Sequence, residues 1–349
     1  MDLNRRDFLK GAAGVAATAG VAGIGGSSLL HGLAGESVAA SEIKNPALAT
    51  FPTAMCHAPM RMMYEKGFYK QFGPKNLTLR VISDRDPVNE GLAGGKLQYA
   101  YGGGLECVIL IDRGMPFVVT GGVHAGCIRV VSQPGIESWK QLKGKKIAVN
   151  MMGSFPYFIA CSMLTKAGLD FKKDAQLLVV SPPDMIPAFR QKKVDAIAMW
   201  DPIPMLIPEL GIPHHMLWDM NTAPRWKDEV CCFSLQPRSV IEKHPGLAWQ
   251  FNECITAASH WLEESDDNIR ECVDIQIKKK YTPGKAKAKF QFDLIKSYDF
   301  SICGNQDICE RSLDWFCDLG AQFGALKHSK KDLMKLMWHD YTKLPKGPA

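Results

Sequence analysis

The feature that most constrains the fold is an internal repeat, in which three short apolar segments recur in the same order after roughly 98 residues. Each segment is rich in aliphatic residues, and helix-forming stretches that end near glycine separate the segments. The segments are residues 47–51, 77–82 and 97–101 in the first half and 146–150, 177–180 and 194–199 in the second. The repeat predicts two similar lobes of alternating strands and helices.

This alternation predicts an α/β fold in which each lobe has a mostly parallel sheet with right-handed crossovers. Residues 127–131 and 230–235 are predicted to cross between the lobes. We therefore expect lobe I to comprise 41–128 and 236–349, and lobe II to comprise 129–235. Ligands bind beyond the carboxyl ends of such strands, so a cleft is expected between lobes that rotate about the crossings.

The segment after Pro237 has the apolar spacing of helices. The expected helices are 248–262, 268–277, 286–298, 308–323 and 331–338. We expect them to complete lobe I and to brace the crossings.

Residues 4–10, with the sequence NRRDFLK, precede an apolar run rich in Gly and Ala that reaches about Leu33. This pattern resembles a twin-arginine export signal. Polar residues interrupt the run, which is too weakly apolar for a comfortable membrane span. Small residues at 38–40 suit a signal peptidase, so 1–40 are predicted to be a signal peptide. We expect passage through the twin-arginine translocase and a periplasmic, or otherwise extracytoplasmic, location.

The remaining roughly 310 residues suffice for two domains, and no later stretch is apolar enough to span a bilayer. The formal net charge is +6. The excess basic residues are dispersed, without an arginine-rich helix or interleaved aromatic residues, so no nucleic-acid partner is expected. We expect a monomer.

The eleven cysteines are many for an exported protein. No C-x-x-C motif or paired zinc spacing is present, so we expect mostly buried small hydrophobes with one or two disulfides. Folded-state export has two explanations. Either a ligand or metal is loaded first, or the fold buries its thiols in a reducing compartment. The odd cysteine number favours the second explanation, which predicts free and inaccessible thiols.

Several motifs resemble type 2 periplasmic substrate-binding proteins of ABC transporters for nitrate, sulfonates, taurine or pyrimidine precursors. The motifs are HAP at 57–59, YEKGFY at 64–69, LKGKKIAV at 142–149 and VDAIAMWDP at 194–202. The resemblance implies a two-lobed type 2 fold, a small polar organic or anionic ligand and an ABC permease as partner. Gln98 departs from the aspartate common in this branch, which concerns loop support more than ligand binding.

We expect ligand contacts from loops at the strand ends. The candidates are Cys56, His57, Gly103, Gly104, His124, Ser154, Phe155, Trp200 and Asp201. The Gly102–Gly104 run can form a tight turn or offer backbone N–H groups to an anion.

Ser154 and Asp201 suit helix N-caps, and Asp201 can alternatively accept a hydrogen bond from a ligand. The histidines can donate to an oxyanion, change charge near pH 6–7 or serve a structural role. Phe155 and Trp200 can form an apolar wall or belong to the core.

Met55, Cys56 and His57 together offer donors for a soft metal such as Cu(I). However, the nearby Met60, Met62 and Met63 fall on a predicted helix, where methionine usually packs the core. We therefore predict neither a metal site nor a cofactor.

The sequence favours a non-enzymatic transport receptor. One alternative is an enzyme like the pyrimidine synthases of thiamine biosynthesis, which share this fold and have a cysteine-rich strand faintly similar to Cys231-Cys232-Phe233. No convincing nucleophile–base pair supports it. Another alternative is a ligand sensor for a membrane partner.

Overall fold

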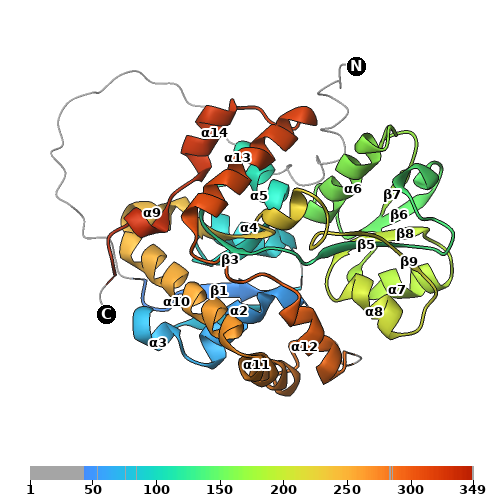
Figure 1. Ribbon diagram of the computed structural model, residues 1–349. Helices are drawn as coiled ribbons and strands as arrows, with labels where there is room; N and C mark the ends of the chain where they lie inside the picture. The colour runs from blue at the N-terminus through green and yellow to red at the C-terminus, as the bar shows by residue number, and fades with distance from the viewer. Residues whose placement is uncertain are drawn as a thin grey trace, which may run out of the picture.

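The chain folds into two α/β lobes, shown by a computed structural model that describes residues 43–347 except 53, 75, 84, 283 and 285 (Figure 1). Lobe II is the green and yellow part at the right of the figure, and lobe I is the remainder. The predicted signal peptide lies outside the described residues. Among those that are described, no helix is both long and apolar enough to cross a membrane.

Lobe I contains a two-stranded and a three-stranded sheet, in the orders β1-β2 and β3-β10-β4. The strands are β1 (Ala47–Thr50), β2 (Thr78–Val81), β3 (Ala100–Gly103), β4 (Phe117–His124) and β10 (Cys232–Pro237). The β1-β2 pair is parallel, whereas β10 runs antiparallel to both neighbours. A parallel bridge between Leu48 and Tyr99 links β1 to the segment that enters β3.

Lobe II is built on one five-stranded sheet in the order β7-β6-β8-β5-β9. The strands are β5 (Ile128–Ser132), β6 (Lys146–Val149), β7 (Gln176–Val179), β8 (Ala196–Trp200) and β9 (His215–Asp219). β6 pairs parallel with β7 and β8, and β5 pairs antiparallel with β8 and β9. Val131, Ile197 and Met199 pack from this sheet into a core beneath the flanking helices.

The structure confirms the repeat, because β1-α2-β2-α4-β3 and β6-α6-β7-α7-β8 follow one order. In each half the first strand lies beside the second and beside the third or its entry. The expectation of mostly parallel sheets is wrong for the crossing strands. β5 and β10 enter from the other lobe and run against the strands they join.

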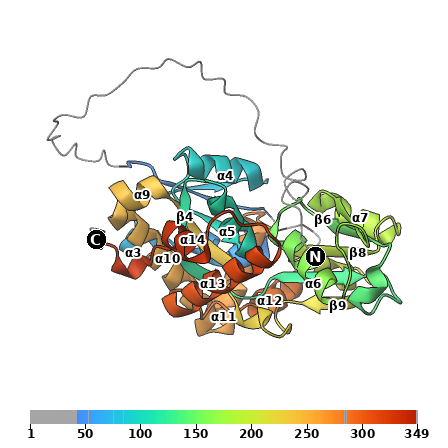
Figure 2. The same ribbon diagram turned by 90° about the horizontal axis from the view of Figure 1, so that it is seen from above.

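Helices cover the sheets on their outer faces (Figures 1 and 2). The first nine elements are η2 (Met55–His57), α2 (Ala58–Glu65), α3 (Tyr69–Phe72), α4 (Arg85–Ala93), α5 (Gly104–Asp112), η3 (Trp139–Leu142), α6 (Phe155–Lys166), α7 (Pro182–Arg190) and α8 (Ile203–Glu209). The remainder are η4 (Trp226–Asp228), α9 (Arg238–Lys243), α10 (Pro245–Glu264), α11 (Asp266–Lys278), α12 (Ala288–Lys296), α13 (Gln306–Gln322), α14 (Lys330–Met337) and η5 (Tyr341–Lys343).

The five expected C-terminal helices are therefore present as α10 to α14. Ser265, Asn305 and Ser329 cap α11, α13 and α14 by accepting a hydrogen bond from a first-turn backbone N–H. α10 packs on α2 and α3, and α13 packs on α5.

The segment after α12 braces the first crossing, where Arg129 Nη2 donates to Ser297 Oγ at 3.3 Å. Ala125 N donates to Asp299 O at 3.0 Å, and Tyr298 Oη donates to the Asp201 carboxylate at 3.0 Å. Arg129 donates to Asp201 and, at 2.9 Å, to Asp219. This buried ion cluster joins the first crossing to lobe II and to the C-terminal region.

Replacing Arg129 with alanine is expected to lower the free energy of unfolding by about 3–5 kcal/mol, because it leaves the buried Asp201 carboxylate uncompensated. Arg129→Lys keeps the charge, so its free energy of unfolding is expected to lie between those of Arg129→Ala and the parent protein. Urea denaturation followed by tryptophan fluorescence measures both.

The matched control is Lys289→Ala, which removes an exposed i,i+4 pair with Asp293 and is expected to cost about 0.3–0.5 kcal/mol. A loss for Arg129→Ala as small as that of the control would contradict the assignment.

Candidate functional site

A small cavity of about 50 Å³ lies between the lobes and next to both crossings. Lobe I lines it with Phe51, Ala54, Cys56, His57, Arg85, Tyr101, Gly103 and Glu106, and lobe II with Ile128, Asn150, Phe155, Pro156 and Trp200. The crossings add Cys127, Cys231 and Cys232. The cavity has room for only a few water molecules, so the lobes have to open to admit a larger solute, which would then touch both of them.

A larger groove of about 820 Å³ lies wholly within lobe II, lined by residues such as Gln133, Lys145 and Arg190. It sits where β6 begins, whereas ligands of such sheets bind beyond the carboxyl ends of the strands. Closure of the lobes would not change it, so the interlobe cavity is the better candidate.

Aromatic side chains from opposite lobes face each other across the cavity. Phe51 stacks on Trp200 with ring centroids 6.3 Å apart and an interplanar angle of 29°. The Arg85 guanidinium lies over the Phe51 ring, 5.5 Å from its centroid. Trp200 therefore contributes an aromatic wall, as the sequence analysis allowed.

Phe155 comes from the first turn of α6 and lies against the glycines of lobe I. A Cβ at Gly104 would be 2.3 Å from Phe155 Cζ, and one at Gly103 would be 3.0 Å from Phe155 Cβ. These glycines let the lobes approach closely. The Gly102–Gly104 run forms the tight turn from strand to helix, since Gly103 ends β3, Gly104 begins α5 and Gly104 N donates to Cys231 O at 2.9 Å. That N–H is not available to an anion.

A carboxylate of the chain itself occupies the start of α6. Glu106 accepts a hydrogen bond from Phe155 N at 3.2 Å and from Arg85 Nε at 2.9 Å. Helix N-termini and arginines are ordinary anion-binding groups. Because the Glu106 carboxylate already accepts from Arg85 Nε and Phe155 N, this position of the cavity is poorly suited to a bare oxyanion.

Three polar atoms of the cavity lining are buried without a hydrogen-bond partner among the described residues: Arg85 Nη2, Tyr101 Oη and Asn150 Oδ1. Buried polar groups are normally paired. Arg85 and Tyr101 offer donors and Asn150 offers an acceptor, so together they suit a solute that has both functions.

His57 lines the cavity but is committed to a structural role on its Nδ1 side. Phe51 N donates to Nδ1 at 3.3 Å, and Thr50 Oγ1 lies 3.2 Å from the same atom. Burial lowers the pKa of His57 well below its ordinary value, and Arg61 adds to the effect. His57 is therefore neutral near pH 7, and a charge change near pH 6–7 is excluded for it.

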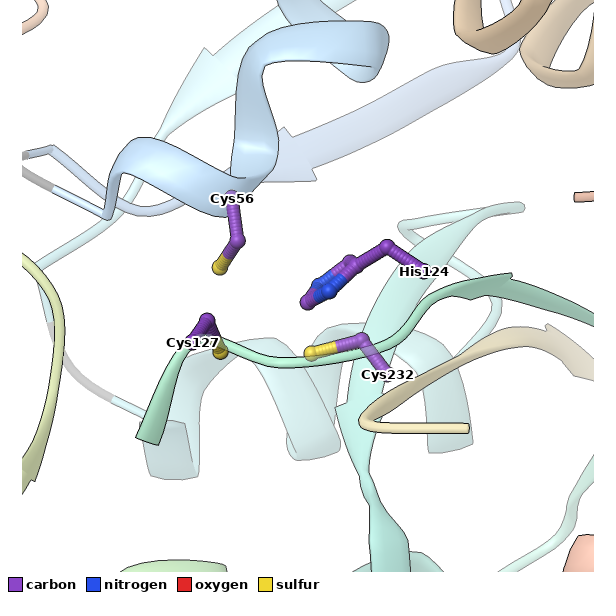
Figure 3. A group of neighbouring side chains, drawn as sticks. All are labelled: Cys56, His124, Cys127 and Cys232. Atoms are coloured by element: carbon purple, nitrogen blue, oxygen red, sulfur yellow. The ribbon is translucent and has the colours of Figure 1, made fainter. Parts of the chain in front are cut away.

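Four side chains from separate segments converge beside the cavity: Cys56, His124, Cys127 and Cys232 (Figure 3). Their donor atoms all lie within 4.8 Å of one another. Cys56 comes from η2, His124 ends β4, Cys127 lies on the first crossing and Cys232 begins β10. Figure 3 shows the sulfur atoms and the imidazole pointing toward a common centre.

Hydrogen bonds from Cys127, Cys231 and Cys56 lower the pKa of Cys232, whereas burial raises the pKa of Cys127 and Cys231. Cys127 Sγ lies 3.2 Å from Cys231 Sγ. The cluster thus differs electrostatically from the isolated buried thiols elsewhere, such as Cys272, whose pKa burial raises to about 12.

Other predicted site residues lie apart from the cavity. Ser154 is the expected N-cap of α6 and accepts from Tyr157 N at 3.4 Å. The N-cap prediction for Asp201 is wrong, because Pro202 is the residue that precedes α8. Asp201 instead pairs with Arg129 and Tyr298 at the hinge, the region where the two crossings join the lobes. Neither these two residues nor His124 lines the cavity.

Sequence reasoning missed Arg85, Tyr101, Glu106 and Asn150. Asn150 is the last residue of the strand predicted at 146–150, and this place at a strand end was a usable signal. Gln98 supports the loop as expected, because it accepts from Ala47 N at 2.7 Å and donates to Gly95 O at 2.6 Å.

The two lobes, two crossings and interlobe cavity define a periplasmic-binding-protein fold. The NMT1-like family matches residues 40–277, and the chain belongs to this family. The twin-arginine translocation signal matches residues 2–22, which confirms the expected signal and extracytoplasmic location.

The chain is similar to a putative binding protein of Brucella abortus, with 30% identity over 139 residues that cover 40% of this chain and 42% of the relative. It is also similar to a putative aliphatic sulfonates-binding protein of Bacillus subtilis, with 30% identity over 221 residues that cover 61% of this chain and 65% of the relative. The chain thus spans less than two thirds of these relatives. The periplasmic nitrate-binding protein NrtA of Synechocystis PCC 6803 shares the fold, with TM-score 0.72, 15% identity and coverage of 85% and 86%.

All eleven cysteines are free thiols in the structure, so the expected disulfides are absent, and ten of the eleven are buried. In the native protein we expect no more than one thiol, that of the half-buried Cys232, to react with Ellman's reagent within minutes. All eleven should react in guanidinium, which serves as the control. Rapid reaction of several thiols without denaturant would show that the packing is wrong.

Proposed function

We propose that the chain is the extracytoplasmic solute-binding component of an ABC transporter. The observation that carries this proposal is the cavity, whose walls come from both lobes and both crossings. A solute bound there stabilises one relative orientation of the lobes, and a permease can recognise that orientation. The names of the relatives, which are binding proteins, support binding rather than catalysis.

The proposed ligand is a small polar organic solute. Its acceptor would face Arg85 Nη2 and Tyr101 Oη, its donor would face Asn150 Oδ1, and its body would lie against Trp200. Taurine or a hydroxyl- or amino-bearing pyrimidine offers both groups, a simple alkanesulfonate offers acceptors alone, and Glu106 disfavours bare nitrate. Glu106 and Asn150 support this preference for an organic ligand.

The proposed partners are the permease subunits and, during export, the twin-arginine translocase, with the binding protein acting as a monomer. One chain supplies both walls of the cavity, which supports this arrangement.

The test is a binding screen by isothermal titration and native mass spectrometry with ethanesulfonate, taurine, nitrate and hydroxymethylpyrimidine. We expect one organic solute to bind at one site per chain and to raise the melting temperature. Failure of all four to bind the native, exported protein would count against solute binding of this class.

Tyr101→Phe should weaken the solute that binds by about 5- to 10-fold, the effect of one lost hydrogen bond. Because Tyr101 Oη has no partner among the described residues, the free energy of unfolding should not fall. Titration calorimetry and urea denaturation measure the two effects.

Tyr99→Phe is the matched control. Tyr99 Oη forms a hydrogen bond with Ser234 Oγ at 2.6 Å, and neither residue lines the cavity. It should lower the free energy of unfolding by about 1 kcal/mol and leave solute affinity unchanged. The opposite pattern in the two variants would rule out the assigned role of Tyr101.

A further inference from the structure

The four-residue cluster beside the cavity has the donor set of a closed metal site. Three thiols and one imidazole, from Cys56, Cys127, Cys232 and His124, lie within 4.8 Å of one another. Zinc bound by Cys₃His is tetrahedral, with Zn–S distances of about 2.3 Å and hence about 3.8 Å between sulfurs. The donors therefore need to approach by about 1 Å or less.

His124 is already oriented as metal-binding histidines are. Its Nδ1 lies 3.3 Å from Ala125 O, to which it can donate, and this tautomer leaves a lone pair on Nε2. Nε2 is buried and has no hydrogen-bond partner in the described part of the chain. Because an unpaired buried nitrogen is costly, the arrangement indicates a missing partner.

The backbone at Cys127 is strained. Its φ is +112°, which is rare for a residue other than glycine. Gly126, directly before it, also has a positive φ of +74°. Strain of this kind persists where the surrounding structure holds the residue in place, and it is concentrated at functional sites. Here the turn places the Cys127 sulfur among the other donors, as Figure 3 shows.

A positive charge is available to balance the site. Arg61 is fully buried in α2 and interacts electrostatically with Cys56. Its hydrogen bonds go to Gln276 Oε1 and, at 2.6 Å, to Phe51 O. No carboxylate in the described ranges forms an ion pair with it, so its charge can offset an anionic thiolate centre.

We propose that Cys56, His124, Cys127 and Cys232 bind one thiophilic metal ion of the Zn²⁺ type at the hinge. Binding a divalent ion to three thiols and a neutral imidazole releases three protons and leaves a centre of net charge −1. The four protein donors complete a tetrahedron, so the ion is structural and joins both crossings to η2 of lobe I. Cys232 is the least buried residue of the four.

The site gives folded-state export a physical reason. Cys127 Sγ and Cys231 Sγ are 3.2 Å apart, close enough to form a disulfide in an oxidising compartment after modest movement. A metal loaded in the cytoplasm would protect Cys127 from this reaction. The proposal is independent of the identity of the solute.

The full chain is expressed with its export signal and recovered from the periplasm. Elemental analysis of this parent protein should find about one equivalent of metal. A second portion is dialysed against a chelator to give the metal-free protein. The metal-free protein should bind Zn²⁺ with a Kd tighter than about 1 nM. Co²⁺ substitution should produce the thiolate charge-transfer absorption of a tetrahedral site.

Cys232→Ser is the main variant, because Cys232 is the least buried of the three cysteines. It should weaken Zn²⁺ binding by roughly 100-fold or more, since losing even a residue that only orients a ligand costs about 10- to 100-fold. Cys161→Ser, which changes a buried thiol of α6, is the matched control and should retain the metal. Circular dichroism of both variants shows whether they have folded.

Three results would overturn the proposal. One is metal-free native protein that binds Zn²⁺ with a Kd weaker than about 1 μM. Another is a Cys127–Cys231 disulfide in peptide maps of the exported protein. The last is equal metal content in Cys232→Ser and Cys161→Ser. Solute binding is measured separately, so failure of the metal site and failure of the proposed function are distinguished.

Discussion

The meeting of the two crossing segments is the constraint on which the rest of the structure depends. Cys231 N donates to His124 O at 2.8 Å, so the second crossing is hydrogen-bonded to the end of β4, where the first begins. The buried Arg129–Asp201 pair holds the first crossing to the end of β8. Because buried polar groups must be paired, these contacts permit few arrangements of the lobes.

This junction also determines the character of the cavity. The absence of side chains at Gly103 and Gly104 lets Phe155 of lobe II approach lobe I. Glu106 then reaches the start of α6 and occupies the position that an anion would take. The close approach of the two lobes therefore both forms the cavity and places the Glu106 carboxylate in its wall. This carboxylate favours an organic solute.

The sequence predicted the strands and helices of the repeat well, because their periodicity reports local backbone conformation and burial. It did not predict β4. Gly121 and Gly122 lie in this strand, whose register is shifted, and a Cβ at Gly122 would be 2.9 Å from Val230. The N-cap role predicted for Asp201 was wrong because its partner, Arg129, lies on another strand that is distant in the chain.

The sequence by itself determined the order of strands and helices, the two lobes and the export signal, all of which follow from short-range patterns. Only the tertiary structure decided which polar groups face the cavity and that Cys56, His124, Cys127 and Cys232 meet. No spacing motif links these residues, because four segments distant in the chain supply them. Their convergence depends on how the crossings pack, which is a property of long-range contacts and not of local periodicity.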